Sequence, residues 1–244
     1  MKIINCNQGT QEWIEARRCM ITGTKLDSVM GTKLDQLMLA CELIGEEATE
    51  QTKAFKATIE MERGTAEEVF ARKHYEETTG TEVEEVGFCI SDEFPFLGCS
   101  GDGWIKTGKV YGEAVEIKSP NTENAVFYKL SSILSPEFLG LGSWSKPTKD
   151  KPDPEFKPSA KAPYNGIPAQ YKWQVVNYFL VNTDLKKLHF LIYDARFISD
   201  KSKMHTITVT REQVQPEIDE AKIQLVKFRE FWLECRDYII ENNF

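Results

Sequence analysis

The sequence contains no run of apolar residues close to the roughly 18 that a membrane-spanning helix requires. Its first eight residues, M-K-I-I-N-C-N-Q, hold no long apolar segment followed by a small-residue cleavage site of the kind that marks secretion. We therefore expect a cytoplasmic protein without a membrane partner.

Cysteine and histidine are few and scattered. The chain has 6 cysteines and 3 histidines, and no two cysteines form a C-x-x-C pair. No cysteine stands at zinc-binding spacing from a histidine. We therefore expect reduced thiols and no zinc site.

Positive charge is not in excess. The chain carries 30 Lys and Arg against 38 Asp and Glu, a net charge of −8. This balance argues against a protein that coats nucleic acid, because such proteins are usually basic. It does not exclude an enzyme that acts on nucleic acid, because metal ions offset acidic residues in an active site and a basic groove can be local.

Length and composition are those of a globular protein. A chain of 244 residues with 41% hydrophobic and 28% charged residues can bury one core, and we predict a single domain over residues 1–244. A Lys- and Pro-rich loop or insertion interrupts it at about 139–167, with lysines at 146, 149, 151, 157 and 161. This segment could contact a nucleic-acid backbone or could be a solvated loop, and both interpretations stay open.

Periodicity predicts the following elements. Helices are expected from Thr10, from Lys25, at 33–45, at 53–79, at 122–131, from Pro168 and from Thr210, and strands at 82–91, 187–193 and 204–209. We predict an α/β fold for this combination of helices and strands.

Residues 98–120 hold the clearest pattern in the chain. Glu116 and Lys118 alternate with apolar residues, which is typical of a half-buried strand. Asp102 lies upstream between two glycines, and a turn centred on Gly108 separates the two segments. A hairpin would bring Asp102 opposite Glu116, with Lys118 beside them.

Two carboxylates and an amine at one point favour a particular chemistry. Mg²⁺ is usually held by one or two carboxylates and keeps several waters, so Asp102 and Glu116 would suit it, with the Ile117 carbonyl as a third oxygen. Lys118 could orient or deprotonate an attacking water, and the set would favour metal-assisted phosphodiester hydrolysis. The alternative is an ion-pair lattice on the protein surface.

Four sequence blocks carry a resemblance to a known family. The order D…E-x-K resembles the PD-(D/E)XK nuclease superfamily, and the whole chain resembles the YqaJ-like, lambda-exonuclease-like family of phage alkaline exonucleases. The blocks are E-W-I-E-A-R-R-C-M-I-T-G-T at 12–24, R-G-T-A-E-E at 63–68, the hairpin at 98–120 and Q-Y-K-W-Q-V-V-N-Y at 170–178. They occur in the order of the family.

The resemblance implies a fold and an activity. The fold would be restriction-endonuclease-like, with a mixed central sheet flanked by helices. The activity would be that of a Mg²⁺-dependent exonuclease, with Mn²⁺ as a possible substitute, which degrades one strand of double-stranded DNA from the 5′ end. It would leave 3′ single-stranded overhangs for phage-type recombination. The resemblance further implies a homotrimeric ring around DNA, a single-strand annealing protein as partner and, for a phage-encoded protein, the host cytoplasm.

The resemblance also implies roles for individual residues. The metal ligands would be Asp102, Glu116 and the Ile117 carbonyl, with Lys118 acting on water. The supporting residues would be Glu68, from the family's G-x-x-x-E pattern, and Gln174, whereas Glu67 is a near miss. The 5′-phosphate would be held by Arg17, Thr24 and Ser100, and Asp92 and Tyr178 match less certain positions.

The chain departs from the family pattern at two places. The family's T-A-S is T-G-T at 22–24, which retains the hydroxyl, and its Q-x-Q is Q-V-V at 174–176. Structural roles remain open for several residues: Arg17 as a solvated helix charge, Thr24 as a helix cap and Glu68 as an exposed carboxylate. The functional alternatives are an endonuclease of the same superfamily and a non-catalytic DNA-binding relative.

Overall fold

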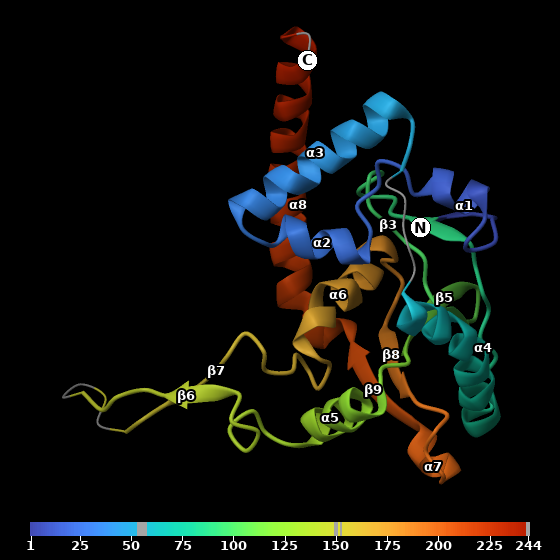
Figure 1. Ribbon diagram of the computed structural model, residues 1–244, viewed down its shortest axis with the longest axis vertical. Coiled ribbons are helices and arrows are strands. Elements are labelled where there is room, and N and C mark those ends of the chain that lie inside the picture. Colours follow the sequence, from blue (N-terminus) through green and yellow to red (C-terminus); the bar gives the residue numbers. More distant parts are fainter. Residues whose placement is uncertain (53–57, 149–150, 152, 243–244) are drawn as a thin grey trace.

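A mixed four-stranded sheet forms the centre of the protein (Figure 1). The computed structural model describes residues 1–52, 58–148, 151 and 153–242. The sheet has the strand order β4-β5-β8-β9. Its strands are β4 (Gly103–Thr107), β5 (Val110–Lys118), β8 (Lys187–Tyr193) and β9 (Met204–Thr210). β9, which the sequence predicts as a strand at 204–209, lies at one edge of the sheet.

The pairing of the strands makes this sheet mixed. β4 and β5 form an antiparallel hairpin, β5 and β8 are parallel, and β8 and β9 are antiparallel. A parallel pair needs a crossover connection, and here it runs through two helices, α5 (Thr122–Ile133) and α6 (Lys172–Val181). The short 3₁₀ helix η1 (Ala169–Tyr171) precedes α6, so the helix predicted from Pro168 begins as a 3₁₀ turn.

Helices cover both faces of the central sheet (Figure 1). On one face, α4 (Ile59–Thr79) packs against β5 and β8. On the other face, α6 packs against α2 (Gly23–Val29) and α8 (Arg211–Glu241), and α3 (Lys33–Thr49) crosses α8. The two remaining helices are the short α1 (Gln11–Ala16) and α7 (Asp200–Lys203).

The alternation of β8 explains why both faces are buried. Leu188, Phe190 and Ile192 belong to the apolar core on the α6 side, whereas Leu191 and Tyr193 belong to the cluster on the α4 side. A strand that buries both faces shows a nearly continuous apolar run, which is the pattern of K-L-H-F-L-I-Y. The predicted α/β class and mixed central sheet are therefore confirmed.

A second, smaller sheet lies beside the first and corrects one prediction. Its three antiparallel strands are β1 (Lys2–Ile4), β2 (Phe88–Ile90) and β3 (Gly98–Cys99). The predicted strand at 82–91 is divided, because Glu84 bridges Trp104 at the edge of the central sheet and the chain then crosses to pair with β1. Apolar and polar residues continue to alternate where the chain crosses between the two sheets, so the sequence pattern does not reveal the crossing.

Two other helix predictions differ from the structure. α3 continues to Thr49, beyond the predicted end at residue 45, and Glu46 is a buried residue of this helix. Asn121, rather than Thr122, caps α5 by accepting a hydrogen bond from the backbone of Asn124. The predicted helix start at Lys53 lies outside the described residues.

The segment at 139–167 contains an antiparallel hairpin of β6 (Gly142–Trp144) and β7 (Phe156–Pro158), which projects away from the body (Figure 1). The prediction of loop was therefore wrong for these strands. The rings of Trp144 and Phe156 meet across the pair, with centroids 5.6 Å apart. Lys149 lies outside the described residues. Over the described part of the chain, no helix combines the length and apolar character needed to span a membrane.

One histidine links stability to pH. His205 of β9 lies 2.6 Å from Ser132 of α5 through Nε2, and burial and the charge of Lys129 lower its pKa. Because the unfolded chain binds this proton more readily, the associated stability is present above about pH 6.5 and is lost as pH falls through the lowered pKa. The free energy of unfolding in urea should therefore fall less between about pH 7 and pH 5 for His205→Gln than for the unaltered protein. Equal pH dependence of the two proteins would contradict this assignment.

Candidate active site

Glu116 is the most enclosed charged group of the candidate site. It lies near the end of β5 with 1% of its surface exposed. From α6, Gln174 Nε2 donates to Glu116 Oε1 at 2.5 Å, and the Tyr178 hydroxyl donates to Oε2. Lys118 Nζ lies 2.5 Å from Oε1. Both carboxylate oxygens are therefore hydrogen-bonded, as burial of a charge requires.

Asp102 lies where the hairpin register predicts. Gly103 pairs with Val115, so Asp102 falls opposite Glu116. Asp102 Oδ2 accepts a hydrogen bond from the Ile117 backbone N–H at 2.7 Å. The juxtaposition of Asp102 and Glu116 is confirmed, and Ile117 contacts Asp102 through its N–H, whereas its carbonyl stays a predicted ligand.

The titration behaviour of the site reflects crowded carboxylates. Burial and then the charge of Glu116 raise the pKa of Asp102 well above its usual range. The same two causes raise the pKa of Glu68, which reaches the site from α4. Burial acts to lower the pKa of Lys118, but the charges of Glu116 and Asp102 outweigh it and raise that pKa. Lys118 is therefore protonated at neutral pH.

The donor set suits a hard divalent cation. No group of three or more His, Cys, Asp or Glu side chains with a metal-binding arrangement occurs within the described ranges. Asp102 and Glu116 supply two carboxylates, which is the usual protein contribution to a Mg²⁺ site that also uses water and substrate oxygens. Their buried position and mutual repulsion are the conditions that a bound cation relieves.

A small cavity of about 70 Å³ adjoins this site. Its lining includes the three predicted phosphate residues, Arg17, Thr24 and Ser100, together with Gln174 and Tyr178. These residues come from segments more than 140 positions apart in the sequence. The fold therefore brings together the side chains that the resemblance groups as a terminal-phosphate site.

Arg17 is held rigidly at this cavity. Its Nη1 donates to Ser100 Oγ at 2.9 Å, and the guanidinium lies 4.1 Å from the centre of the Trp13 ring. Trp13 Nε1 also donates to Ser100 Oγ, at 2.8 Å. Burial lowers the pKa of Arg17, although an arginine remains charged at neutral pH. The alternative of a solvated helix charge does not describe this side chain.

The departures from the family pattern have local causes. A Cβ on Gly23 would lie 3.0 Å from Gln174 Cγ, so glycine in T-G-T lets α2 approach α6 closely. Val176 is fully buried in the core, and an apolar side chain is therefore suited to the position where the family often has its second glutamine.

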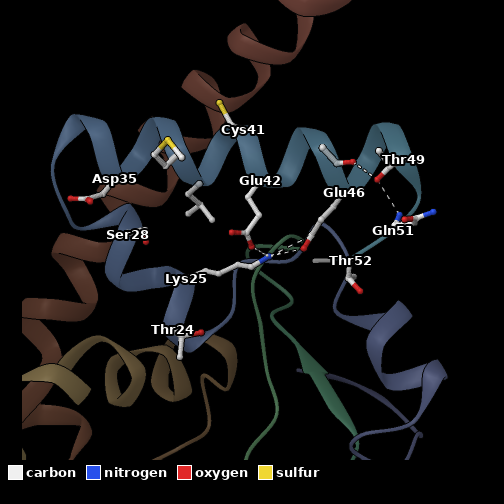
Figure 2. A pocket seen from close by; sticks show the side chains of 13 residues that line it. Thr24, Lys25, Ser28, Asp35, Cys41, Glu42, Glu46, Thr49, Gln51 and Thr52 are labelled. Carbon is white, nitrogen blue, oxygen red and sulfur yellow. Dashed lines mark hydrogen bonds and ion pairs between the residues drawn. The ribbon is translucent and has the colours of Figure 1, made fainter. Parts of the chain in front are cut away.

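A larger pocket lies between α2 and α3 (Figure 2). Lys25 extends between two carboxylates there, 3.0 Å from Glu42 and 3.3 Å from Glu46. Glu46 also accepts the Cys19 backbone N–H at 2.8 Å, and Cys19 has a φ of +58°. Glu46 therefore fixes the turn between Arg17 and Thr24, a role that the sequence analysis did not predict.

Three arginines near the site were not predicted to have roles. Arg72 of α4 donates from Nε to the Asp102 carbonyl at 3.0 Å. Arg63 Nη2 donates to the carbonyl of Ser119 at 2.9 Å, and Arg196 Nη2 to that of Pro120 at 3.2 Å. These bonds hold the backbone on either side of the acidic pair. The spacing of Arg72 four residues after Glu68 was the available signal, because such residues share a helix face.

Asp92 does not join the other predicted residues. Its side chain is 72% exposed and forms an ion pair at 2.7 Å with the amino group of Met1. A separate cleft of about 1030 Å³ opens beside Glu68 and Asp102, and its lining continues over Trp13 and Arg72. This cleft gives an extended molecule access to the acidic side chains.

The mixed central sheet and the acidic pair with its lysine match the restriction-endonuclease-like, PD-(D/E)XK-like fold that the sequence predicts. The family model described as YqaJ-like viral recombinase domain matches residues 12–185, and the chain belongs to this family. A search among curated proteins gave no match.

Solved structures agree with this assignment of the fold. The alkaline exonuclease LHK-Exo from Laribacter hongkongensis superposes with a TM-score of 0.70, at 22% identity, over 96% of this chain and 98% of its own. LHK-Exo in complex with dAMP gives a TM-score of 0.71 with the same identity and coverage. A phage-related exonuclease from Haemophilus somnus 129PT gives 0.58 at 13% identity, over 91% and 96% of the two chains.

The Tyr178 hydroxyl should contribute to stability through Glu116. Tyr178→Phe leaves the buried Glu116 Oε2 without its donor, so the free energy of unfolding should fall by about 1–3 kcal/mol in a denaturant titration. Tyr111→Phe is the matched control, because its hydroxyl donates at 2.7 Å to the more exposed Glu84 and water can replace it. Equal losses for the two variants would contradict the importance of burial.

Proposed function

We propose that the protein is a Mg²⁺-dependent exonuclease that degrades one strand of double-stranded DNA from its 5′ end and leaves 3′ overhangs. One observation carries the proposal: Gln174 and Tyr178 contact Glu116 and also line the cavity that contains Arg17. The proposed pocket for a terminal phosphate and the proposed hydrolytic site would thereby be joined through one helix. Membership of the YqaJ-like family supports the assignment to phage-type recombination.

The acidic pair would hold the metal. Asp102, Glu116 and the Ile117 carbonyl are the proposed ligands of Mg²⁺, for which Mn²⁺ could substitute. The bound ion would polarise the phosphodiester and lower the pKa of a water. Lys118, protonated and held beside Glu116, would orient the attacking water and offset the negative charge that develops on the phosphate.

The other side chains would keep this arrangement in place. Gln174 and Tyr178 fix the orientation of the Glu116 carboxylate. Glu68 adds a third carboxylate from α4, close enough for its pKa to respond to Glu116. Asp92, exposed and paired with the N-terminus, would have at most a remote influence.

Strand polarity would follow from the small cavity. The Arg17 guanidinium can bind phosphate oxygens through charge-assisted hydrogen bonds, and the Ser100 and Thr24 hydroxyls would add neutral ones. A cavity of about 70 Å³ suits a single terminal group better than a continuing strand. We therefore propose recognition of a 5′-phosphate at the end of the duplex.

Further parts of the proposal rest on the family. We propose that residues 1–244 act as one nuclease domain and that three copies form a ring around DNA. The partner would be a single-strand annealing protein, and a phage-encoded enzyme would act in the host cytoplasm. The family match at residues 12–185 supports these statements.

Lys118 should be essential for cleavage. With Mg²⁺ and linear duplex labelled at either end, Lys118→Ala should lower the rate constant of cleavage by about 10²–10³, because it removes a preorganised positive charge. Lys106→Ala, which removes an exposed lysine paired with Glu84, is the control and should cleave normally. A closed circle should resist the unaltered protein. Cleavage of the circle would favour an endonuclease, and no cleavage with Mg²⁺ or Mn²⁺ would reject a nuclease.

Arg17 should set the preference for a 5′-phosphate. The unaltered protein should degrade a 5′-phosphorylated end more efficiently than a 5′-hydroxyl end, by about 10- to 100-fold in kcat/KM, the range of a hydrogen bond to a charged group. Arg17→Ala should abolish this ratio. Arg18→Ala, which removes a guanidinium bonded to the Glu50 carbonyl, should retain it. A phosphate preference that survives in Arg17→Ala would place the 5′-phosphate elsewhere.

A further inference from the structure

The β6–β7 hairpin projects from the body of the protein, and the candidate site does not explain it (Figure 1). We call the described residues between 141 and 161 the arm. Its strands pair from Gly142 with Pro158 to Trp144 with Phe156. Trp144 is 55% exposed, although it meets the Phe156 ring. The arm extends from the body with little covering it (Figure 1).

A two-stranded hairpin that no other element covers needs a further source of stability. A single hairpin with three residues in each strand is marginally stable in water, because each strand lacks a second neighbour and a covered face. Contact with a further surface would supply the missing stabilisation. The side chains of the arm indicate which kind of surface this is.

Positive charge is concentrated on this part of the chain. Residues 139–167 contain five lysines and three acidic residues, whereas the whole chain has a net charge of −8. Lys151 pairs with Glu155 at 3.3 Å. The structure assigns no ion pair or hydrogen bond to the side chains of Lys146, Lys157 and Lys161 within the described ranges. Three ammonium groups without a partner among the described residues, on one projecting element, fit a polyanion.

The segments that flank the arm, α5 before it and residues 162–172 after it, are called its root here, and they contact the candidate site. The chain enters through α5, which begins four residues after Lys118, and leaves through η1 and α6. Tyr171 of η1 lies with its ring centre 5.1 Å from Lys118 Nζ. Gln170 Nε2 donates to the Tyr128 hydroxyl of α5 at 3.0 Å, which ties the two sides of the root together. The base of the arm is therefore tied to the elements that carry the candidate site, while the hairpin itself extends away from the body.

The root is also fixed against the long C-terminal helix. The Tyr164 hydroxyl donates to Glu217 Oε2 of α8 at 2.6 Å, and Lys172 forms an ion pair with the same carboxylate at 3.3 Å. The segment that follows the arm is therefore fixed to α8 through one carboxylate. Because the root is fixed to the body, a molecule bound at the lysines of the arm would be held to the body of the protein.

We propose that the arm binds the phosphate backbone of duplex DNA outside the active site and holds the duplex while its end is degraded. This inference rests on the proposed function, which makes duplex DNA the substrate. Lysine contacts to phosphate are electrostatic and carry no sequence information, so the arm would act equally on all sequences. A second copy of this chain is the competing occupant, because the body is acidic.

The salt dependence of DNA binding tests the proposal. The variant Lys146→Gln, Lys157→Gln, Lys161→Gln would be compared with the unaltered protein, using a labelled short duplex in EDTA so that no cleavage occurs. Each phosphate contact contributes about 0.9 to the slope of log K against log salt, so three lost contacts should reduce the slope by about 2.7. Between about 50 and 200 mM salt, the affinity of the unaltered protein should therefore fall about 40-fold more than that of the variant.

A charge-matched control uses lysines on the body. Lys2→Gln, Lys109→Gln, Lys227→Gln removes three exposed lysines from β1, the β4–β5 turn and α8, and its slope should equal that of the unaltered protein. Equal slopes for the arm variant and the unaltered protein would overturn the proposal. An arm variant whose sedimentation changes while its slope does not would assign the arm to contact between copies and would also overturn it.

Cleavage of 5′-labelled duplex in Mg²⁺ separates this proposal from the proposed function. If the unaltered protein cleaves and the arm variant keeps its salt slope, the arm proposal alone fails. If the unaltered protein binds duplex with the expected difference in slope but cleaves nothing, the proposed nuclease function fails and the arm remains a DNA-binding element.

Discussion

The hydrogen-bonded burial of Glu116 is the interaction on which the arrangement of the site depends. An ionised carboxylate removed from water is costly unless nearby donors replace its hydration. Two donors come from α6, Gln174 and Tyr178, and Lys118 comes from the same strand. The parallel crossover from β5 to β8 passes through α6 and brings that helix over the Glu116 face of the sheet. The β5–α6–β8 connection and the hydrogen bonds to Glu116 therefore both place α6 over this face of the sheet.

The same helix couples the two halves of the proposed function. Gln174 lies against Gly23 at the start of α2, so the segment that carries Thr24 packs directly on a residue that holds Glu116. On the other side of that segment, Glu46 holds the Cys19 backbone. A shift of α6 would therefore disturb the acidic pair and the Arg17 cavity together, so that in the proposed function the recognition of an end would depend on the same helix as hydrolysis.

Local patterns made a large part of the site predictable. The hairpin around Gly108 follows from alternation and a turn signal, and it fixes Asp102 opposite Glu116 because hairpin register is a short-range property. The alternation did not predict the division of 82–91 between two sheets, because strand pairing with β1 is a long-range contact. The arm was missed for a related reason: Pro and Lys signal a loop, whereas the pairing of Trp144 with Phe156 depends on segments ten or more residues apart.

Predictions that rested on resemblance succeeded in placing residues near one another, but their roles remain proposals. Arg17, Thr24 and Ser100 share a cavity, which no periodicity would have grouped. The resemblance assigned no role to Glu46, which accepts the Cys19 N–H, or to Arg63, which lies in the R-G-T-A-E-E block and donates to the Ser119 carbonyl. These contacts could not be predicted from local patterns, because they join residues 27 and 56 positions apart in the sequence.

The net negative charge of the chain is compatible with a DNA enzyme because of how its cations are distributed. Many lysines and arginines are neutralised by neighbouring carboxylates, as Lys25 is by Glu42 and Glu46, and these add little to long-range attraction. Arg17 is instead bonded to a neutral hydroxyl, that of Ser100, and keeps its charge available to an anion. The net charge of the whole protein has little effect on a phosphate in the site, because interactions between exposed charges are screened beyond about 10 Å at moderate salt. The attraction at contact distance depends mainly on nearby cations that have no carboxylate partner. Under the proposed function, an acidic surface would reduce unspecific binding along DNA, while a cation such as Arg17 would hold a phosphate group near the carboxylates of the site.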